Sequence, residues 1–234
     1  MWNKSERLYD MKINSKKSLL KSVVYLTLFV VCTLLVQYVD VKPVGINGTD
    51  IGFSTVNVWF HSKTGTNMFL YNITDCLGLV PIFICVVFGL LGLTQWIKRK
   101  SIFKVDKILI VMGCYYVIVI LCYLFFEIVP INYRPILING KMESSYPSST
   151  TLLVLSVIPT LKLYIDCKFN KHKFTQVISV LLIVFSCFMV FSRLICGVHW
   201  LTDIIGAILL SKGLFCCFKA VVLHYENKGI KYGI

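Results

Sequence analysis

Six long apolar segments, separated by short polar stretches, run along the chain. Each segment is continuous rather than alternating between apolar and polar residues, which excludes the strands of a membrane β-barrel and favours helices. Four segments approach or exceed the roughly 20 residues of a bilayer-crossing helix, and the fourth and fifth are shorter. The pattern predicts an all-α bundle of six transmembrane helices at 19–39, 76–96, 108–129, 150–165, 177–191 and 200–223.

These segments form one unit, because no internal repeat and no long linker divides them. We expect a cytoplasmic N-terminal tail at 1–18, a membrane domain at 19–223 and a cytoplasmic C-terminal tail at 224–234. The first tail is polar, and no small-residue cleavage site follows the first apolar segment. That segment is therefore expected to be a retained anchor rather than a signal peptide.

Composition supports the membrane assignment. Hydrophobic residues make up 57% of the 234 residues and charged residues 15%, with a mean hydropathy of +0.77. Soluble domains have about 45–50% apolar and about 25% charged residues, so a soluble, disordered or disulfide-rich secreted chain is excluded. The ten cysteines include no C-x-x-C pair and lie mostly within apolar segments. We therefore expect free thiols, with no disulfide and no metal site.

The net charge of +13 is unevenly distributed. Nineteen of the 24 lysines and arginines lie on the side of the membrane that would carry both termini. The positive-inside rule places that side in the cytoplasm. The charge thus reports topology and does not predict a nucleic-acid partner. The opposite side holds Lys42, Lys63, Arg134, Lys141 and Arg193.

Two connections between spans are expected to face outward, and the second carries polar residues that suit an anion. Residues 40–75 form a long aromatic-containing segment, which lies on the membrane surface or is a loosely packed loop. In the next connection, Arg134 precedes a proline, and Ser148 and Ser149 come at the start of the fourth span. An arginine fork and a helix start would together form a phosphate cradle. The alternative is an interfacial arginine and a serine that caps the helix.

A third connection adds a histidine and an aspartate. His199 and Asp203 are four residues apart at the start of the sixth span, so a helix places them on one face. Asp203 would then accept a proton from one ring nitrogen while the other faces a substrate. An interfacial histidine beside Trp200, with Asp203 as a helix cap, is the alternative. An ionisable group inside a span is nevertheless a functional candidate.

These residues resemble the type 2 phosphatidic acid phosphatase family, within the lipid phosphatase and vanadium haloperoxidase superfamily. The third family motif, S-R-x5-H-x3-D, matches completely, and its residues are Ser192, Arg193, His199 and Asp203. The first motif, K-x6-R-P, keeps its arginine and proline, but Glu127 replaces the lysine. The resemblance also covers the order of the motifs and the six-span layout.

The second family motif, P-S-G-H, is also altered. It keeps Pro147 and Ser148, but Ser149 replaces the glycine and Thr150 replaces the histidine. The family uses that histidine as the acid that protonates the leaving oxygen, and a threonine does not do this at neutral pH. Glu143 in the same connection is either a replacement acid or a solvated loop carboxylate.

The resemblance implies a mechanism without a cofactor or metal. His199 would attack phosphorus and form a phosphohistidine, which water then hydrolyses. Asp203 would hold the correct tautomer of the imidazole. The phosphoryl oxygens would be bound by Arg134, Ser148, Ser149 and Arg193.

The leading hypothesis is an integral membrane phosphatase that hydrolyses lipid phosphates or isoprenoid diphosphates at the outer face of the cell membrane. Diphosphates are slightly favoured, because their leaving group needs less help from an acid. The alternatives are a relative that only binds a phospholipid headgroup, a lipid phosphoryl transferase and a small transporter. The expected partner is a membrane lipid, and the composition suits a bacterial multi-pass protein. The oligomeric state is left open.

Overall fold

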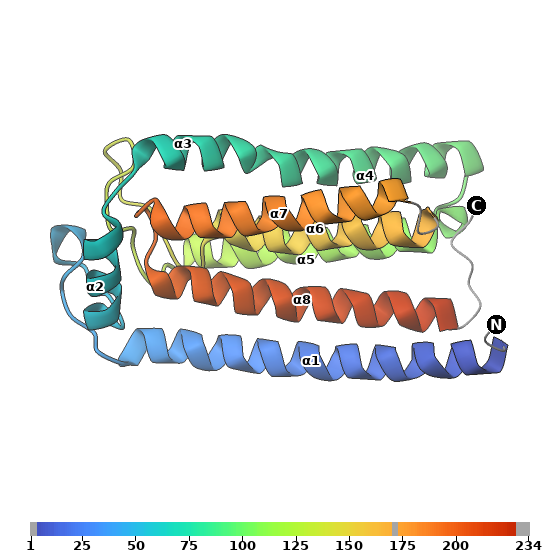
Figure 1. Ribbon diagram of the computed structural model, residues 1–234, viewed down its shortest axis with the longest axis horizontal. Helices are drawn as coiled ribbons and strands as arrows, with labels where there is room; N and C mark the ends of the chain where they lie inside the picture. The colour runs from blue at the N-terminus through green and yellow to red at the C-terminus, as the bar shows by residue number, and fades with distance from the viewer. Residues whose placement is uncertain (1–3, 170–172, 228–234) are drawn as a thin grey trace.

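A computed structural model describes residues 4–169 and 173–227, which fold into a bundle of long helices (Figure 1). The described residues contain no β-strand, only three isolated β-bridges in connections. The helices are α1 (Lys4–Tyr38), α2 (Ser54–Thr64), α3 (Met68–Leu77), α4 (Leu79–Arg99), α5 (Lys107–Ile128), α6 (Ser149–Lys168), α7 (Lys173–Ile195) and α8 (Leu201–Asn227). Two single 3-10 turns, η1 (Ile46–Gly48) and η2 (Ile102–Lys104), lie in connections.

The described residues contain six helical stretches long and apolar enough to cross a membrane, which confirms the predicted all-α, six-span bundle. The second stretch begins earlier than expected, at Met68, because α3 runs almost directly into α4 at Gly78. Three polar residues in α3 lower the local hydropathy and hide the first turns of this stretch from a sequence scan. These residues are Asn72, Thr74 and Asp75.

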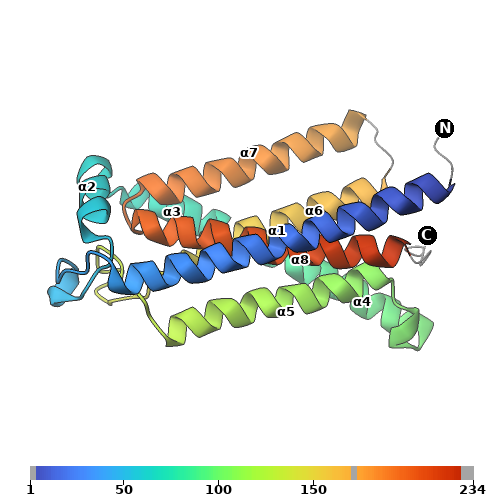
Figure 2. The same cartoon turned by 90° about the horizontal axis from the view of Figure 1, so that it is seen from below.

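The segment between the first two spans is an ordered cap rather than a loose loop. Its main element, α2, stands across one end of the bundle (Figures 1 and 2). The side chain of Asn57 is fully buried there and joins α2 to the start of α8. Its amide nitrogen donates to the hydroxyl of Thr202 at 3.0 Å, and its amide oxygen accepts from the Thr202 backbone N–H at 3.2 Å.

Helices α1 and α8 lie side by side along most of their length (Figures 1 and 2). Small residues allow this close approach. Ser22 on α1 donates to the carbonyl of Gly213 at 2.8 Å, and Ser18 donates to the carbonyl of Cys216 at 2.9 Å. Hydroxyl groups that bond to a neighbouring helix are a common means of association where no water competes. This pairing fixes the helix whose first turn carries Asp203, next to His199.

The direction of the helices places all three candidate motifs at one end of the bundle. The first residue of α1 and the last of α8 lie at one end in Figure 1. The connections α5–α6 and α7–α8 lie at the opposite end, next to α2. Motifs far apart in the sequence therefore share one face.

We expect this motif-bearing end to face outward, as the lysine and arginine distribution predicts. A fluorescent protein fused after Ile234 should fluoresce, and an alkaline phosphatase inserted after Gly140 in the α5–α6 connection should be active. Exchanging the two reporters at the same positions is the control and should abolish both signals. Activity of the phosphatase at the C-terminus would invert the topology.

Candidate active site

The first turn of α8 holds a buried carboxylate against an imidazole. Asp203 is the third residue of α8, and its Oδ2 accepts from the backbone N–H of Trp200 at 2.8 Å, as a helix-capping carboxylate does. The same oxygen lies 3.5 Å from Nδ1 of His199. Asp203 is 0% exposed and His199 is 2% exposed. The capping bond therefore also aims the carboxylate at the histidine.

Two hydrogen-bonding contacts tie the connection before His199 to α2 and to the residues that follow α2. The backbone N–H of Asn67 donates to the carbonyl of Cys196 at 2.9 Å, and Nε2 of His61 lies 3.0 Å from the carbonyl oxygen of Gly197. Gly197 has φ +71°, and a Cβ added there would collide with the carbonyl oxygen of Gly65. Both the positive φ and the lack of space for a Cβ require a glycine at this position.

Arg193, near the end of α7, is the most deeply buried cation of the site. The residue is 1% exposed, yet its guanidinium reaches three polar groups on two other helices. Nη1 donates to Thr74 Oγ1 at 3.2 Å, and Nη2 donates to Asp75 Oδ1 at 3.1 Å and to Thr150 Oγ1 at 2.6 Å. The ring of Tyr71 lies 4.9 Å from the guanidinium carbon, a cation–π contact.

Arg134, in the α5–α6 connection, also approaches the ring of Tyr71. Its guanidinium carbon lies 5.9 Å from the ring centroid of Tyr71. Its Nε is 3.2 Å from Oε2 of Glu143, and its backbone N–H donates to the Glu143 carbonyl at 3.1 Å. Trp200 ties this connection to α8, because its indole N–H donates to the carbonyl of Tyr133 at 2.7 Å.

Several buried polar atoms around this cluster have no hydrogen-bond partner among the described protein atoms. They include Nη1 of Arg134, Nε of Arg193 and both ring nitrogens of His199. Buried donors normally have a partner. Two arginine donors beside an imidazole are the groups that an anion with several oxygens, such as a phosphate, would satisfy.

Burial and nearby charge set the protonation of His199. Burial lowers the pKa of His199 well below its usual value, and the positive charges of Arg134 and Arg193 lower it further. A second positive charge is unfavourable where water is excluded. At neutral pH the ring is therefore neutral, with a lone pair free on one nitrogen.

The start of α6 completes this end of the bundle. Ser148 is fully buried, its backbone N–H donates to the carbonyl of Asp203 at 3.1 Å, and its hydroxyl donates to Thr151 Oγ1 at 3.1 Å. Ser149 and Thr150 follow in the first helical turn, where backbone N–H groups are free to meet an anion.

The structure thus brings together most of the predicted site residues. Arg134, Arg193, His199 and Asp203 meet around the start of α8, and Thr150 contacts Arg193 directly. Glu127 is exposed near the end of α5, and the carboxylate that pairs with Arg134 is Glu143.

Sequence reasoning missed the contribution of α3. Tyr71, Thr74 and Asp75 lie three and four residues apart, so they share one face of that helix, and all three contact Arg193. The available signal was a charged residue, Asp75, directly before an apolar segment. The sequence of α3 does not reveal which other helix these three side chains face.

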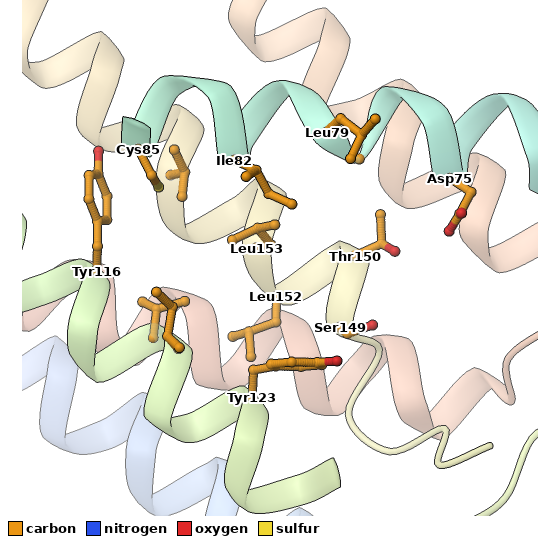
Figure 3. A pocket seen from close by; sticks show the side chains of 14 residues that line it. Asp75, Leu79, Ile82, Cys85, Tyr116, Tyr123, Ser149, Thr150, Leu152 and Leu153 are labelled. Carbon is orange, nitrogen blue, oxygen red and sulfur yellow. The ribbon is translucent and has the colours of Figure 1, made fainter. Parts of the chain in front are cut away.

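A cavity of about 470 Å³ adjoins the cluster. It lies between α4, α5 and α6, with apolar walls such as Leu79, Ile82 and Leu152 (Figure 3). Asp75 and Thr150, which both contact Arg193, line one end of it. Within the described residues, no group of three or more histidine, cysteine, aspartate or glutamate side chains is arranged to hold a metal ion.

Comparison with known proteins identifies the family. Residues 115–227, from the middle of α5 to the end of α8, match the PAP2 superfamily. This part of the chain, 113 of its 234 residues, belongs to that superfamily. A crystal structure described as the first transmembrane PAP2 type phosphatidylglycerolphosphate phosphatase, from Bacillus subtilis, aligns with a TM-score of 0.57. That alignment covers 90% of this chain and 98% of the other, at 17% identity. No curated protein matches the sequence.

The expected resemblance is therefore confirmed at the level of the family and the fold. The protein is a multi-pass membrane protein with the fold of a PAP2 phosphatase. The matched region contains all three motif positions discussed above, whereas α1 to α4 lie before it. The Arg193 partners on α3 thus come from outside the part that defines the family.

We predict that Gly197→Ala destabilises the protein more than Gly140→Ala. Both glycines have positive φ, at +71° and +73°, so each alanine costs about 1–2 kcal/mol in backbone strain. Only Gly197 adds a collision, because nothing lies within 4 Å of a Cβ at Gly140. Thermal denaturation in detergent should show the larger drop in midpoint for Gly197→Ala. Equal drops would mean that the contact with Gly65 does not constrain the connection.

Proposed function

We propose that this PAP2 protein is an integral membrane phosphatase that hydrolyses lipid phosphates or isoprenoid diphosphates through a phosphohistidine. One observation carries the proposal. A neutral, carboxylate-backed His199 lies among two buried arginines that have unused donors, beside an apolar cavity. A nucleophile, a phosphate-binding group and a space for a hydrocarbon chain are thus adjacent.

In the first step, Nε2 of His199 attacks phosphorus in line with the leaving oxygen. The new P–N bond forms as the P–O bond breaks, and the ring becomes positively charged. Asp203 lies next to Nδ1 and stabilises that charge, while it keeps the proton on the correct nitrogen. The donors of Arg134 and Arg193 stabilise the phosphoryl oxygens, which gain charge in the transition state.

In the second step, water attacks the phosphohistidine. The P–N bond breaks, inorganic phosphate forms, and the imidazole returns to its neutral state. The same arginine donors serve both steps, because the phosphoryl group stays in place while the group opposite to it changes. No residue has to move between the two steps.

The cavity supports a substrate with a hydrocarbon chain. Its rim includes Leu79, Ile82 and Ile120, whose side chains are exposed on the side of the bundle. Because these residues belong to membrane-spanning helices, that side faces the bilayer. A lipid chain would reach the cavity laterally, with its phosphate at the end near Arg193. This arrangement suits both phosphatidate and an isoprenoid diphosphate.

We predict that His199→Ala abolishes phosphate release, whereas Cys196→Ala, a matched truncation of a buried neighbour, retains most of it. The reason is that only the histidine supplies the attacking lone pair. Detergent-purified proteins should be given phosphatidate and an isoprenoid diphosphate in parallel, without added metal. A rapid-quench experiment should trap a phosphoenzyme that is stable to alkali and labile to acid, as phosphohistidine is.

Three results would contradict the proposed hydrolysis by His199. Equal activity of His199→Ala and Cys196→Ala would remove His199 as the nucleophile. Retention of phospholipid by a folded wild-type protein, with no release of phosphate, would favour the alternative of a protein that only binds the headgroup. Transfer of the phosphoryl group to a second lipid, with no free phosphate, would favour the transferase.

The low pKa of His199 leads to a prediction about pH. The acid limb of kcat/KM reports protonation of the free nucleophile, so activity should persist below the usual histidine range. Arg134→Gln removes a positive charge, makes the imidazolium less unfavourable, and should move that limb to higher pH by up to about one unit. Lys141→Gln removes an exposed cation from the same connection and should leave the limb in place. A limb that moves to lower pH in Arg134→Gln would contradict the assignment.

A further inference from the structure

The cavity has one polar end, and it adjoins the phosphate-binding cluster. In Figure 3 the oxygens of Asp75, Ser149 and Thr150 lie at one end, and Tyr116 and Cys85 lie at the other. Nη2 of Arg193 donates to both Asp75 and Thr150. The polar end of the cavity and the buried arginine are therefore in direct contact.

This contact locates the leaving oxygen of a substrate. With the phosphate on Arg193 and His199 and the hydrocarbon chain in the cavity, the oxygen that links them lies at the junction. The side chains at that junction are those of Asp75, Ser149 and Thr150. Two of the three are hydroxyl groups, which do not release a proton near neutral pH. Only Asp75 carries a carboxyl group, a side chain that commonly serves as a general acid.

We propose that Asp75 is the general acid that protonates the leaving oxygen. This step rests on the proposed phosphatase function. As His199 attacks phosphorus, the P–O bond to the leaving group breaks, and the carboxyl proton of Asp75 passes to that oxygen, which departs as an alcohol. The resulting carboxylate then accepts a proton from the water that hydrolyses the phosphohistidine, and Asp75 is ready for the next cycle.

The surroundings of Asp75 suit this exchange of protons. Its side chain is 59% exposed, in contrast with the 1% of Arg193, so water can replace its proton. In the free protein the carboxylate pairs with Arg193 at 3.1 Å. A bound phosphate would compete for that guanidinium, and the carboxyl group would then be released towards the leaving oxygen.

Tyr123 is the competing donor, because it also lines the cavity and its hydroxyl points towards the polar end (Figure 3). Asp75 is preferred for a geometric reason. It contacts Arg193, whose position ties it to the phosphate, whereas Tyr123 lies on α5, away from that contact. Tyr123→Phe is therefore the matched control.

The test compares leaving groups. Dodecyl phosphate releases a poor alkoxide and needs an acid, whereas a dodecyl-substituted nitrophenyl phosphate releases a stable phenolate and does not. Asp75→Asn should lower kcat for the alkyl ester about 10²–10⁴-fold and change kcat for the aryl ester only a few-fold. Asp75→Glu should restore part of the alkyl activity. Tyr123→Phe should leave the ratio of the two rates unchanged.

The outcomes separate the two proposals. An equal loss on both esters in Asp75→Asn would make Asp75 a positioning residue for Arg193 and overturn its role as an acid. No loss on either ester would overturn it as well, as would a selective loss in Tyr123→Phe. In each of these cases, hydrolysis of the aryl ester by the wild type and its loss in His199→Ala would still support the phosphatase function. Failure of the wild type to hydrolyse either ester, with hydrolysis of an isoprenoid diphosphate retained, would overturn the role of Asp75 alone. Failure on all three substrates would overturn both proposals.

Discussion

The arrangement of helices around the site depends on the burial of one guanidinium. Arg193 is 1% exposed within an apolar bundle, where an unpaired charge would cost several kcal/mol. That cost is offset by acceptor oxygens from two other helices, Thr74 and Asp75 on α3 and Thr150 on α6. The ends of α3, α6 and α7 are therefore fixed relative to one another by a single side chain.

The second constraint joins helix capping to chemistry. Asp203 satisfies the backbone N–H of Trp200 and faces His199 with the same oxygen. A change that moved the carboxylate away from the histidine would also leave a helix-capping donor without its partner. The connection before His199 is tightened by the carbonyl of Gly65, which leaves space only for Gly197. The site is thus held rigid by interactions that the fold needs in any case, as preorganised catalysis requires.

The sequence predicts the features that depend on neighbouring residues, and it does not predict contacts between residues that are far apart in the chain. Hydropathy locates six spans because each is a continuous property of its own segment. The spacing of His199 and Asp203 predicts their proximity. In the structure His199 lies before the start of α8, and Asp203 meets it as the capping residue of that helix. The contact between Arg193 and Asp75 joins residues 118 positions apart, and no local pattern records which face of α3 meets α7. For the same reason the motif alignment marks Glu127 as an altered position but does not reveal that Arg134 pairs with Glu143.

The two arginines of the site share a pattern that bears on how a phosphate would bind. Each is buried and each pairs with a carboxylate that water reaches, since the side chains of Asp75 and Glu143 are 59% and 37% exposed. The free-energy cost of removing the guanidinium groups from water is therefore already offset in the folded protein before a substrate binds. A phosphate that replaces these carboxylates exchanges one negative partner for another. An exposed side chain can turn away by rotating about its own bonds, and no packed helix has to shift. The buried cations hold the site in shape, and the exposed carboxylates are the groups free to respond to a substrate.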